Sequence, residues 1–264
     1  MAIYLLKKSY QLKDLNEVDF KDLWGDQGIF TTMWIFGKPP KILFFENHIK
    51  NLIRSLHIYG IKKITLKKDI LKIINKNLIK NNNYNHLLRI ALNKKIISIS
   101  LRKRVPTKLD FRLRLVNLKR EKPEYKNLKY KKILSYLSKM DNSKFDIGLI
   151  YKKKILETGT SNLLFIKDKK VFTPKKDCYE GNTFKFFKTK VKKIIKKDIL
   201  IKEINKYDEI ILIGSGKGVT SVKTIKQIEW KRKSLNQFKI FSKYYRSAIK
   251  NCNQFKFSYY EKSK

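Results

Sequence analysis

The sequence has 264 residues, of which 42% are apolar and 12% aromatic, so it is not a disordered chain and can form one or two domains with a sizeable core. The formal net charge is +41, yet only nine of the 63 basic residues are Arg, and Lys is spread over nearly the whole chain. A surface that reads DNA bases would favour Arg and concentrate its charge. The composition therefore favours codon bias, and we expect no specific nucleic-acid partner.

The N-terminal half reads as a mixture of strands and amphipathic helices. Strands are expected at 3–6, 28–36, 42–45, 87–92, 96–101 and 109–116, where apolar and β-branched residues cluster between turn residues. Helices are expected from Ile49 to Leu56, where apolar residues recur every three or four positions, and from Leu66 to Leu78. The strands at 28–36 and 42–45 should form a hairpin, as should those at 87–92 and 96–101.

A short charged segment divides the chain. Residues 118–125 carry five charged side chains and Pro123, which predicts a linker between a smaller N-terminal α/β domain, 1–117, and a larger C-terminal domain, 126–264. The C-terminal part should contain an amphipathic helix at 133–137 and a strand at 147–151 whose hairpin partner carries Glu157. A long basic helix at 184–197, a buried strand at 209–213 and a last helix at 236–250 should follow.

Metal, membrane and export signals are absent from the sequence. Cys178, Cys252 and the three histidines are not at metal-ligand spacing, which predicts no metal site and free thiols in a reducing compartment. No apolar run approaches the roughly 18 residues of a membrane span, and the N-terminus lacks the apolar segment of a signal peptide. We therefore expect a cytoplasmic protein with no membrane partner.

Two glycine-containing turns could accept an anion. The run from Gly214 to Gly218 follows a strand but matches neither the Walker pattern nor the dinucleotide fingerprint, so alone it reads as a turn. Gly181–Thr183 precedes a helix, where free N–H groups can bind a phosphate, although an ordinary helix cap explains it equally. Both turns lie in the same half as Lys126 and Glu157. A lysine, a carboxylate and a phosphate seat together suit pyridoxal 5'-phosphate.

Six blocks in the same order resemble the fold-type IV pyridoxal-phosphate enzymes, which include branched-chain aminotransferases, D-amino-acid aminotransferases and aminodeoxychorismate lyases. The resemblance covers most of the chain, roughly residues 25–222. Each block is a weak signal alone, but six in the right order are a strong one. The blocks are Gly25–Thr32, Glu46–Leu52, Tyr125–Tyr130, Glu157–Phe165, Thr173–Pro174 with Gly181–Phe184, and Gly214–Val222.

The resemblance implies an α/β (α+β) fold of two domains, a homodimer and pyridoxal 5'-phosphate as cofactor. Lys126 would hold the cofactor covalently, with Lys129 as the alternative in a shifted register. Tyr130 would contact the ring hydroxyl and Glu157 the ring nitrogen. The phosphate would be bound by Asn182, Thr183, Ser215 and Gly216.

Departures from the aminotransferase pattern indicate which branch of the family the chain resembles. Thr31 stands where aminotransferases usually carry Glu, and Phe44 stands where they carry a phosphate-binding Arg. Both departures resemble the lyase branch, while Lys94 lies where the family has an Arg-containing substrate loop. Thr31 and Lys94 are therefore the expected substrate contacts.

The expected activity is that of a 4-amino-4-deoxychorismate lyase, which releases pyruvate and 4-aminobenzoate for folate biosynthesis. Two alternatives remain open. One is a branched-chain or D-amino-acid aminotransferase of the same family, which would act on a different small amino substrate. The other is a basic nucleic-acid-binding protein on a degenerate enzyme fold.

Overall fold

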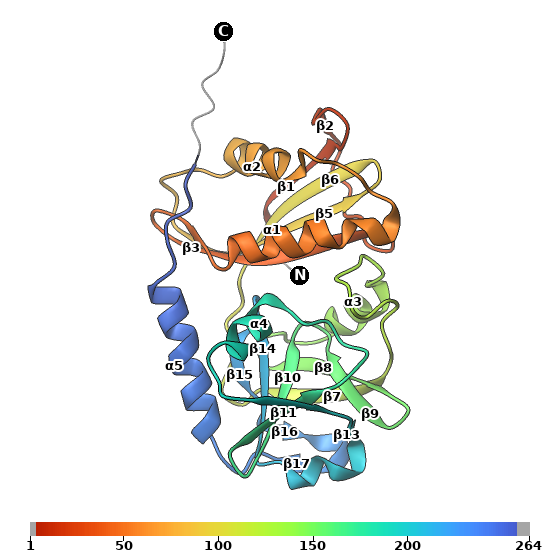
Figure 1. Cartoon of the computed structure of the whole chain (residues 1–264), viewed down its shortest axis with the longest axis vertical. Coiled ribbons are helices and arrows are strands. Elements are labelled where there is room, and N and C mark those ends of the chain that lie inside the picture. Colours follow the sequence, from red (N-terminus) through yellow and green to blue (C-terminus); the bar gives the residue numbers. More distant parts are fainter. Residues whose placement is uncertain (1–3, 258–264) are drawn as a thin grey trace. The chain divides into compact units, whose positions relative to one another are not determined.

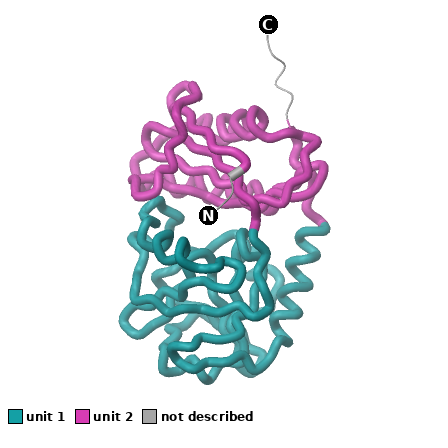
Figure 2. Tube along the Cα trace, turned by 180° about the vertical axis from the view of Figure 1, so that it is seen from behind, with its two compact units in different colours: residues 1, 105–250 teal, residues 2–104, 251–264 magenta. Residues whose placement is uncertain are grey.

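The computed structural model describes residues 4–257, and these form two compact units. One unit, called unit 1, contains residues 105–250, and the other, unit 2, contains residues 4–104 and 251–257 (Figure 2). Residues 118–125, which the sequence suggested as a linker, belong to unit 1. The segment that carries Lys126 and the two glycine-containing turns, at 181–183 and 214–218, therefore all lie in unit 1.

Unit 2 is built on a six-stranded antiparallel sheet with the strand order β2-β1-β6-β5-β3-β4. Alternate residues of its long strands, such as Met33, Leu88 and Ile99, belong to one apolar core that both helices of the unit share. The strands are β1 Tyr4–Gln11, β2 Glu17–Val18, β3 Gly28–Gly37, β4 Lys41–Ile42, β5 Tyr84–Asn93 and β6 Ile96–Lys103.

The helices of unit 2 begin close to where the apolar periodicity places them. They are α1 Phe45–Arg54, α2 Leu66–Asn77 and a 3₁₀ turn η1 Leu56–Tyr59, which ends at Gly60 with a φ of 61°. The expected strand at 42–45 is shorter than predicted, because Phe44 adopts a left-handed conformation with a φ of 57°. That residue breaks the strand after Ile42 and starts the helix at Phe45.

Unit 1 contains two sheets that enclose one apolar core. One has the order β13-β9-β8-β7-β16-β17 and the other has the order β12-β11-β10-β14-β15. Phe111, Leu115, Phe165, Leu212 and Trp230 belong to this core, which we call the inter-sheet core. The strands are β7 Arg112–Asn117, β8 Phe145–Tyr151, β9 Lys154–Thr158, β10 Asn162–Lys167, β11 Lys170–Pro174, β12 Ile194–Lys197, β13 Ile199–Leu200, β14 Glu209–Gly214, β15 Gly218–Ser221, β16 Thr224–Ile225 and β17 Trp230–Lys231.

Three α-helices pack against the sheets of unit 1. Helix α3, Lys131–Leu137, packs Ile133 and Leu137 against Ile147 and Leu149 of β8. Helices α4, Asn182–Lys188, and α5, Asn236–Lys250, contact β14 (Figure 1). Their Phe187 and Phe241 rings lie 4.8 Å apart. Two 3₁₀ turns complete the unit, η2 Ile201–Lys206 and η3 Lys226–Ile228.

The long basic helix expected at 184–197 is wrong. The helix α4 ends at Lys188, and residues 194–197 form β12, which pairs in parallel with β11 from Val171 to Pro174. The intervening sequence carries Lys190, Lys192 and Lys193, whose like charges disfavour helix continuation. The pairing with β11 satisfies the backbone groups that a longer helix would have satisfied.

The described residues contain neither a membrane-crossing helix nor a metal-ligand cluster. Within 4–257, no helix combines the length and the apolar character that a bilayer crossing requires. Over the same residues, His, Cys, Asp and Glu side chains do not gather in groups of three or more that could hold a metal ion.

Candidate active site

Lys126 lies in the loop that joins β7 to α3. Asn127, which is fully buried, shapes this loop, because its side-chain amide donates to the carbonyl oxygens of Glu121 and Lys122 at 2.6 and 3.1 Å. Its side-chain oxygen accepts the N–H of Lys129 at 3.1 Å. The loop is therefore held on both sides of Lys126, whose side chain is half-buried.

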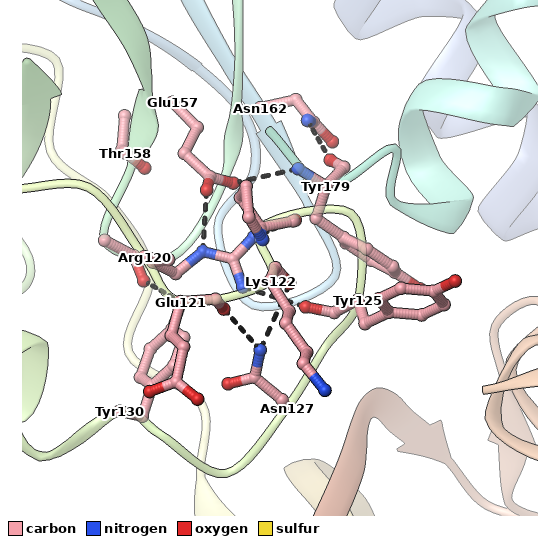
Figure 3. A network of polar contacts seen from close by, with 12 residues as sticks. Arg120, Glu121, Lys122, Tyr125, Asn127, Tyr130, Glu157, Thr158, Asn162 and Tyr179 are labelled. Atoms are coloured by element: carbon pink, nitrogen blue, oxygen red, sulfur yellow. Dashed lines mark hydrogen bonds and ion pairs between the residues drawn. The ribbon is translucent and has the colours of Figure 1, made fainter. Parts of the chain in front are cut away.

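Arg120 joins this loop to Glu157 on β9. Its Nε donates to Oε1 of Glu157 at 2.6 Å, and both side chains are buried (Figure 3). The two terminal nitrogens of Arg120 donate to the carbonyl oxygens of Tyr125, at 2.9 Å, and Pro123, at 2.6 Å. A guanidinium can make several such bonds at once because its donors lie in a rigid plane. The carboxylate and the lysine loop are thus fixed to one another.

A β-bulge determines which face of the sheet Glu157 occupies. Leu149 pairs with Glu157 and Ile150 pairs with Ile155, so Leu156 is an extra residue in β9. Paired residues share a face. Ile150 and Ile155 belong to the inter-sheet core, whereas Leu149 packs with α3. A regular strand would put Glu157 on the same face as Ile155. The bulge turns the carboxylate to the face of α3 and the lysine loop.

The ionisable groups of this cluster have shifted pKa values. Burial lowers the pKa of Lys126 to about 8, with a further decrease from Arg120, while Glu157 acts in the opposite direction. Burial raises the pKa of Glu157, and the Arg120 guanidinium and the Tyr179 N–H oppose that rise. Burial also raises the pKa of Tyr130 well above its usual range. Tyr130 is therefore a neutral donor, and its hydroxyl donates to the carbonyl oxygen of Gly159 at 2.5 Å.

Tyr179 connects Glu157 to the start of α4. Its N–H donates to Oε2 of Glu157 at 3.3 Å, and its carbonyl oxygen accepts the side-chain amide of Asn162 (Figure 3). The side-chain oxygen of Asn162 accepts the N–H of Gly181 at 3.0 Å, which fixes the residue before α4. The ring of Tyr179 lies 5.9 Å from Nζ of Lys126. Glu157, Lys126 and the first turn of α4 are therefore part of one connected arrangement.

The first turn of α4 contains Asn182 and Thr183, which are 4% and 1% exposed. Among residues 4–257, no side chain caps this helix end by a hydrogen bond. The hydroxyl oxygen of Thr183 is buried and has no hydrogen-bond partner within the same residues. A buried hydroxyl without a partner costs about 1–3 kcal/mol, so its position calls for a ligand or an ordered water.

Ser215 and Gly216 lie in the tight turn between β14 and β15 and are half-buried. The strand β14 pairs with β10, with Ile213 opposite Asn162, so this turn starts beside the turn that follows Glu157. Gly214 lies so close to Ser161 that a Cβ atom at Gly214 would be 2.9 Å from the serine Oγ. The sequence reading of Gly214–Gly218 as a turn after a strand is confirmed.

The structure brings some of the predicted site residues together within unit 1 and places two others in unit 2. Lys126, Tyr130 and Glu157 surround Arg120, and Asn182 and Thr183 are connected to them through Tyr179. Thr31 is a buried residue of β3 whose hydroxyl is 2.7 Å from Nδ1 of His48, itself buried in α1. Lys94 is exposed in the β5–β6 turn.

Sequence reasoning missed the residues that connect this cluster. Arg120 was counted among the charges of a presumed linker, and Tyr179 and Asn162 were not singled out. One signal was available, because Arg is rare in this chain and an Arg close to a candidate lysine stands out. The hydrogen bonds of Asn162 and Tyr179 depend on the pairing of β10 with β14 and on the path of the chain before α4, which no local pattern encodes.

Comparisons with known proteins agree with the fold and with the residue blocks. The family model described as amino-transferase class IV matches residues 28–225. A branched-chain aminotransferase from Thermoproteus uzoniensis, crystallised with norvaline, is 15% identical with a TM-score of 0.74, covering 95% of this chain and 96% of that chain. The Escherichia coli branched-chain aminotransferase is 12% identical with a TM-score of 0.71, covering 97% of each chain.

A third similar structure is the pyridoxal-phosphate-bound form of a hypothetical aminotransferase from Mycobacterium tuberculosis. It is 13% identical with a TM-score of 0.67, covering 92% of this chain and 99% of that chain. No curated protein sequence matches the chain. At these identities the structural likeness establishes the fold, and the family match over residues 28–225 confirms the resemblance that the six blocks indicated.

Proposed function

This chain belongs to the class IV aminotransferase family, and we propose that it uses pyridoxal 5'-phosphate to act as a 4-amino-4-deoxychorismate lyase. The observation that best supports the cofactor is the arrangement around Arg120, which holds Glu157 beside a lysine whose pKa is lowered to about 8. The partnerless Thr183 hydroxyl at the start of α4 supports a bound phosphate, because it is a buried donor in need of an acceptor.

The residues of unit 1 suit this cofactor. Glu157 keeps lone pairs free for a ring nitrogen, because Arg120 occupies one oxygen and the Tyr179 N–H makes only a long bond to the other. The Tyr130 hydroxyl keeps its proton and donates it to Gly159, so its oxygen would accept a hydrogen bond from a ring hydroxyl. The phosphate would be bound by the backbone and hydroxyl groups of Asn182, Thr183, Ser215 and Gly216, all neutral donors, as at other helix N-termini and tight turns.

Lys126 has two tasks in this proposal. Pyridoxal phosphate, when bound, supplies an aldehyde that bonds to amines and a ring that accepts electron density. Lys126 would hold the cofactor covalently at rest. Once the substrate amine had taken its place, the released Lys126 amine would take a proton from the substrate carbon that carries the amino group. With a pKa of about 8, roughly a tenth of the free amine is neutral at pH 7, against less than a thousandth for an ordinary lysine.

Two features support the lyase branch. Thr31 has a neutral side chain whose hydroxyl is within hydrogen-bond distance of His48, where the aminotransferases usually carry a carboxylate. Phe44, in place of their phosphate-binding Arg, starts α1 in a left-handed conformation and offers no positive charge. The molecular formula of 4-amino-4-deoxychorismate equals the sum of those of pyruvate and 4-aminobenzoate, so the lyase needs no second substrate. Formation of the aromatic ring favours the products.

A product assay tests this proposal. Purified protein given aminodeoxychorismate alone should release pyruvate and 4-aminobenzoate, and it should convert little D-alanine or leucine with 2-oxoglutarate. Brisk transamination without pyruvate release would establish the aminotransferase alternative.

Borohydride reduction should attach the cofactor to the peptide that contains Lys126, whereas an adduct on Lys129 would require the shifted register. A protein that takes up no pyridoxal phosphate would overturn the proposal.

A further inference from the structure

A buried ion pair joins the two sheets of unit 1 at one end of the inter-sheet core. Asp146 of β8 is fully buried, and Lys217 of the β14–β15 turn is 9% exposed. The Nζ of Lys217 lies 4.0 Å from Oδ2 of Asp146. It also donates to the carbonyl oxygen of Asn142 at 3.1 Å and lies 4.7 Å from the centre of the Phe111 ring. A buried pair of this kind is costly to desolvate, which makes a specific role worth seeking.

On its own sheet, Asp146 organises the turn that follows Glu157. Its Oδ2 accepts the hydroxyl groups of Thr158, at 2.9 Å, and Thr160, at 2.6 Å. The Thr158 oxygen in turn accepts the N–H of Ser161 at 2.8 Å. A Cβ atom at Gly159 would lie 3.0 Å from Oδ1 of Asp146, so the turn passes directly over the carboxylate. The position of Glu157, one residue before this turn, therefore depends on Asp146.

On the other sheet, Lys217 is part of the turn that carries Ser215 and Gly216. The hydrogen bond to Asn142 and the attraction to Asp146 hold this turn against the loop and strand of the first sheet. The turn is short, since β14 ends at Gly214 and β15 begins at Gly218. A displacement of Lys217 would therefore also displace the N–H groups of Ser215 and Gly216.

We propose that the Asp146–Lys217 pair is a positioning device that sets the distance between Glu157 and the Ser215–Gly216 turn. This inference rests on the proposed function, in which Glu157 contacts the ring nitrogen of the cofactor and the turn contacts its phosphate. The separation of those two groups is nearly fixed by the covalent skeleton of the cofactor. Glu157 and the Ser215–Gly216 turn belong to different sheets, so the protein must hold these sheets in one relative position. The Asp146–Lys217 pair links the two sheets close to both groups.

Cofactor binding by a Lys217→Met variant tests this role. Dissociation constants for pyridoxal phosphate and for pyridoxal, which lacks the phosphate, are measured by absorbance titration for the wild type and the variant. Methionine keeps the length and the apolar contact with Phe111 but removes the charge. The preference for the phosphorylated form should fall at least tenfold, mainly through weaker binding of pyridoxal phosphate. Lys169→Met, at the exposed β10–β11 turn, is the matched control and should leave the preference unchanged.

Two further variants separate positioning from general stability. Lys217→Arg keeps the charge and should retain most of the preference. Asp146→Asn should reduce it, and the Asp146→Asn, Lys217→Met double variant should be no worse than the more affected single variant. If the pair has a purely structural role, its loss should weaken the binding of both ligands equally, and the ratio of the two dissociation constants should stay at the wild-type value. That result would overturn this inference but not the proposed function. A wild type that binds neither ligand would overturn the proposed function together with it.

Discussion

At the scale of single residues, Glu157 is the group whose charge matters most in the proposed function. Glu157→Gln keeps the shape of the side chain and can still bond Arg120, but a neutral amide cannot stabilise a protonated ring nitrogen. Turnover should fall by a factor that corresponds to about 2 kcal/mol or more, the scale of a charge-assisted hydrogen bond. Covalent attachment of the cofactor, measured by borohydride reduction and mass spectrometry, should persist. Unchanged turnover would remove Glu157 from the chemistry.

The pKa of Lys126 leads to a prediction about pH. Its neutral amine is the reactive form, so the rate at which the apoprotein takes up pyridoxal phosphate should rise with pH and level off above about pH 8. With an ordinary lysine, the uptake rate would level off only near the usual lysine pKa of about 10.4. Glu157 raises the pKa of Lys126. In the Glu157→Gln variant, the uptake rate should therefore level off at a lower pH than in the wild type. A shift to higher pH in that variant would contradict the assigned contact.

At the scale of elements, α4 and α5 are held together by aromatic packing. Phe241 of α5 is fully buried against Phe187 of α4. Replacement of Phe241 by Ala removes a large buried ring, and we expect a loss of about 3–5 kcal/mol in the free energy of unfolding, measured by urea denaturation. Ile240→Ala, on the exposed side of the same helix, is the control and should change stability by less than about 0.5 kcal/mol. Equal losses would mean that α5 does not pack as described.

The spacing of apolar residues predicted most helices and strands, because an element with one buried face needs apolar residues at regular intervals along the sequence. The strands at 28–36, 87–92 and 96–101 and the helix at 236–250 were all predicted in place. The helix at 184–197 was overextended, because the pairing of β12 with β11 depends on residues distant in the sequence. The bulge at Leu156 leaves no local signal, because one added residue is invisible until the partner strand is known.

At the scale of the whole molecule, the charge of +41 bears on non-specific binding. Many lysines form ion pairs with nearby carboxylates, such as Lys154 with Asp198 and Lys119 with Asp177, and the basic residues occur in both units. We expect weak DNA binding that disappears as salt is raised, because counterion release alone would drive it. Fluorescence anisotropy at 50 and 200 mM salt measures this. Tight, sequence-selective binding at physiological salt would favour the nucleic-acid-binding alternative.

The family and the mixed α/β fold follow from the sequence, whereas the connections of the site do not. The blocks around Lys126 and Glu157 were sufficient to suggest a lysine and a carboxylate facing one pocket. Arg120 was hidden by its charged neighbours, since a run of charges usually indicates solvent exposure. Its burial becomes clear only when Glu157 is placed on the α3 face of the sheet. The predicted domain boundary at 118–125 and the homodimer remain predictions.

The extra residue in β9 also has an evolutionary consequence. Substitution of Leu156 by another apolar residue leaves the number of residues in the strand unchanged, so Glu157 keeps its face of the sheet. Loss of one residue between Ile155 and Glu157 would restore a regular ladder, and the strand would still form. The carboxylate would then enter the inter-sheet core, where charge is strongly disfavoured. Selection at this position should therefore tolerate changes of side chain and reject single-residue deletions, even though strand pairing survives both.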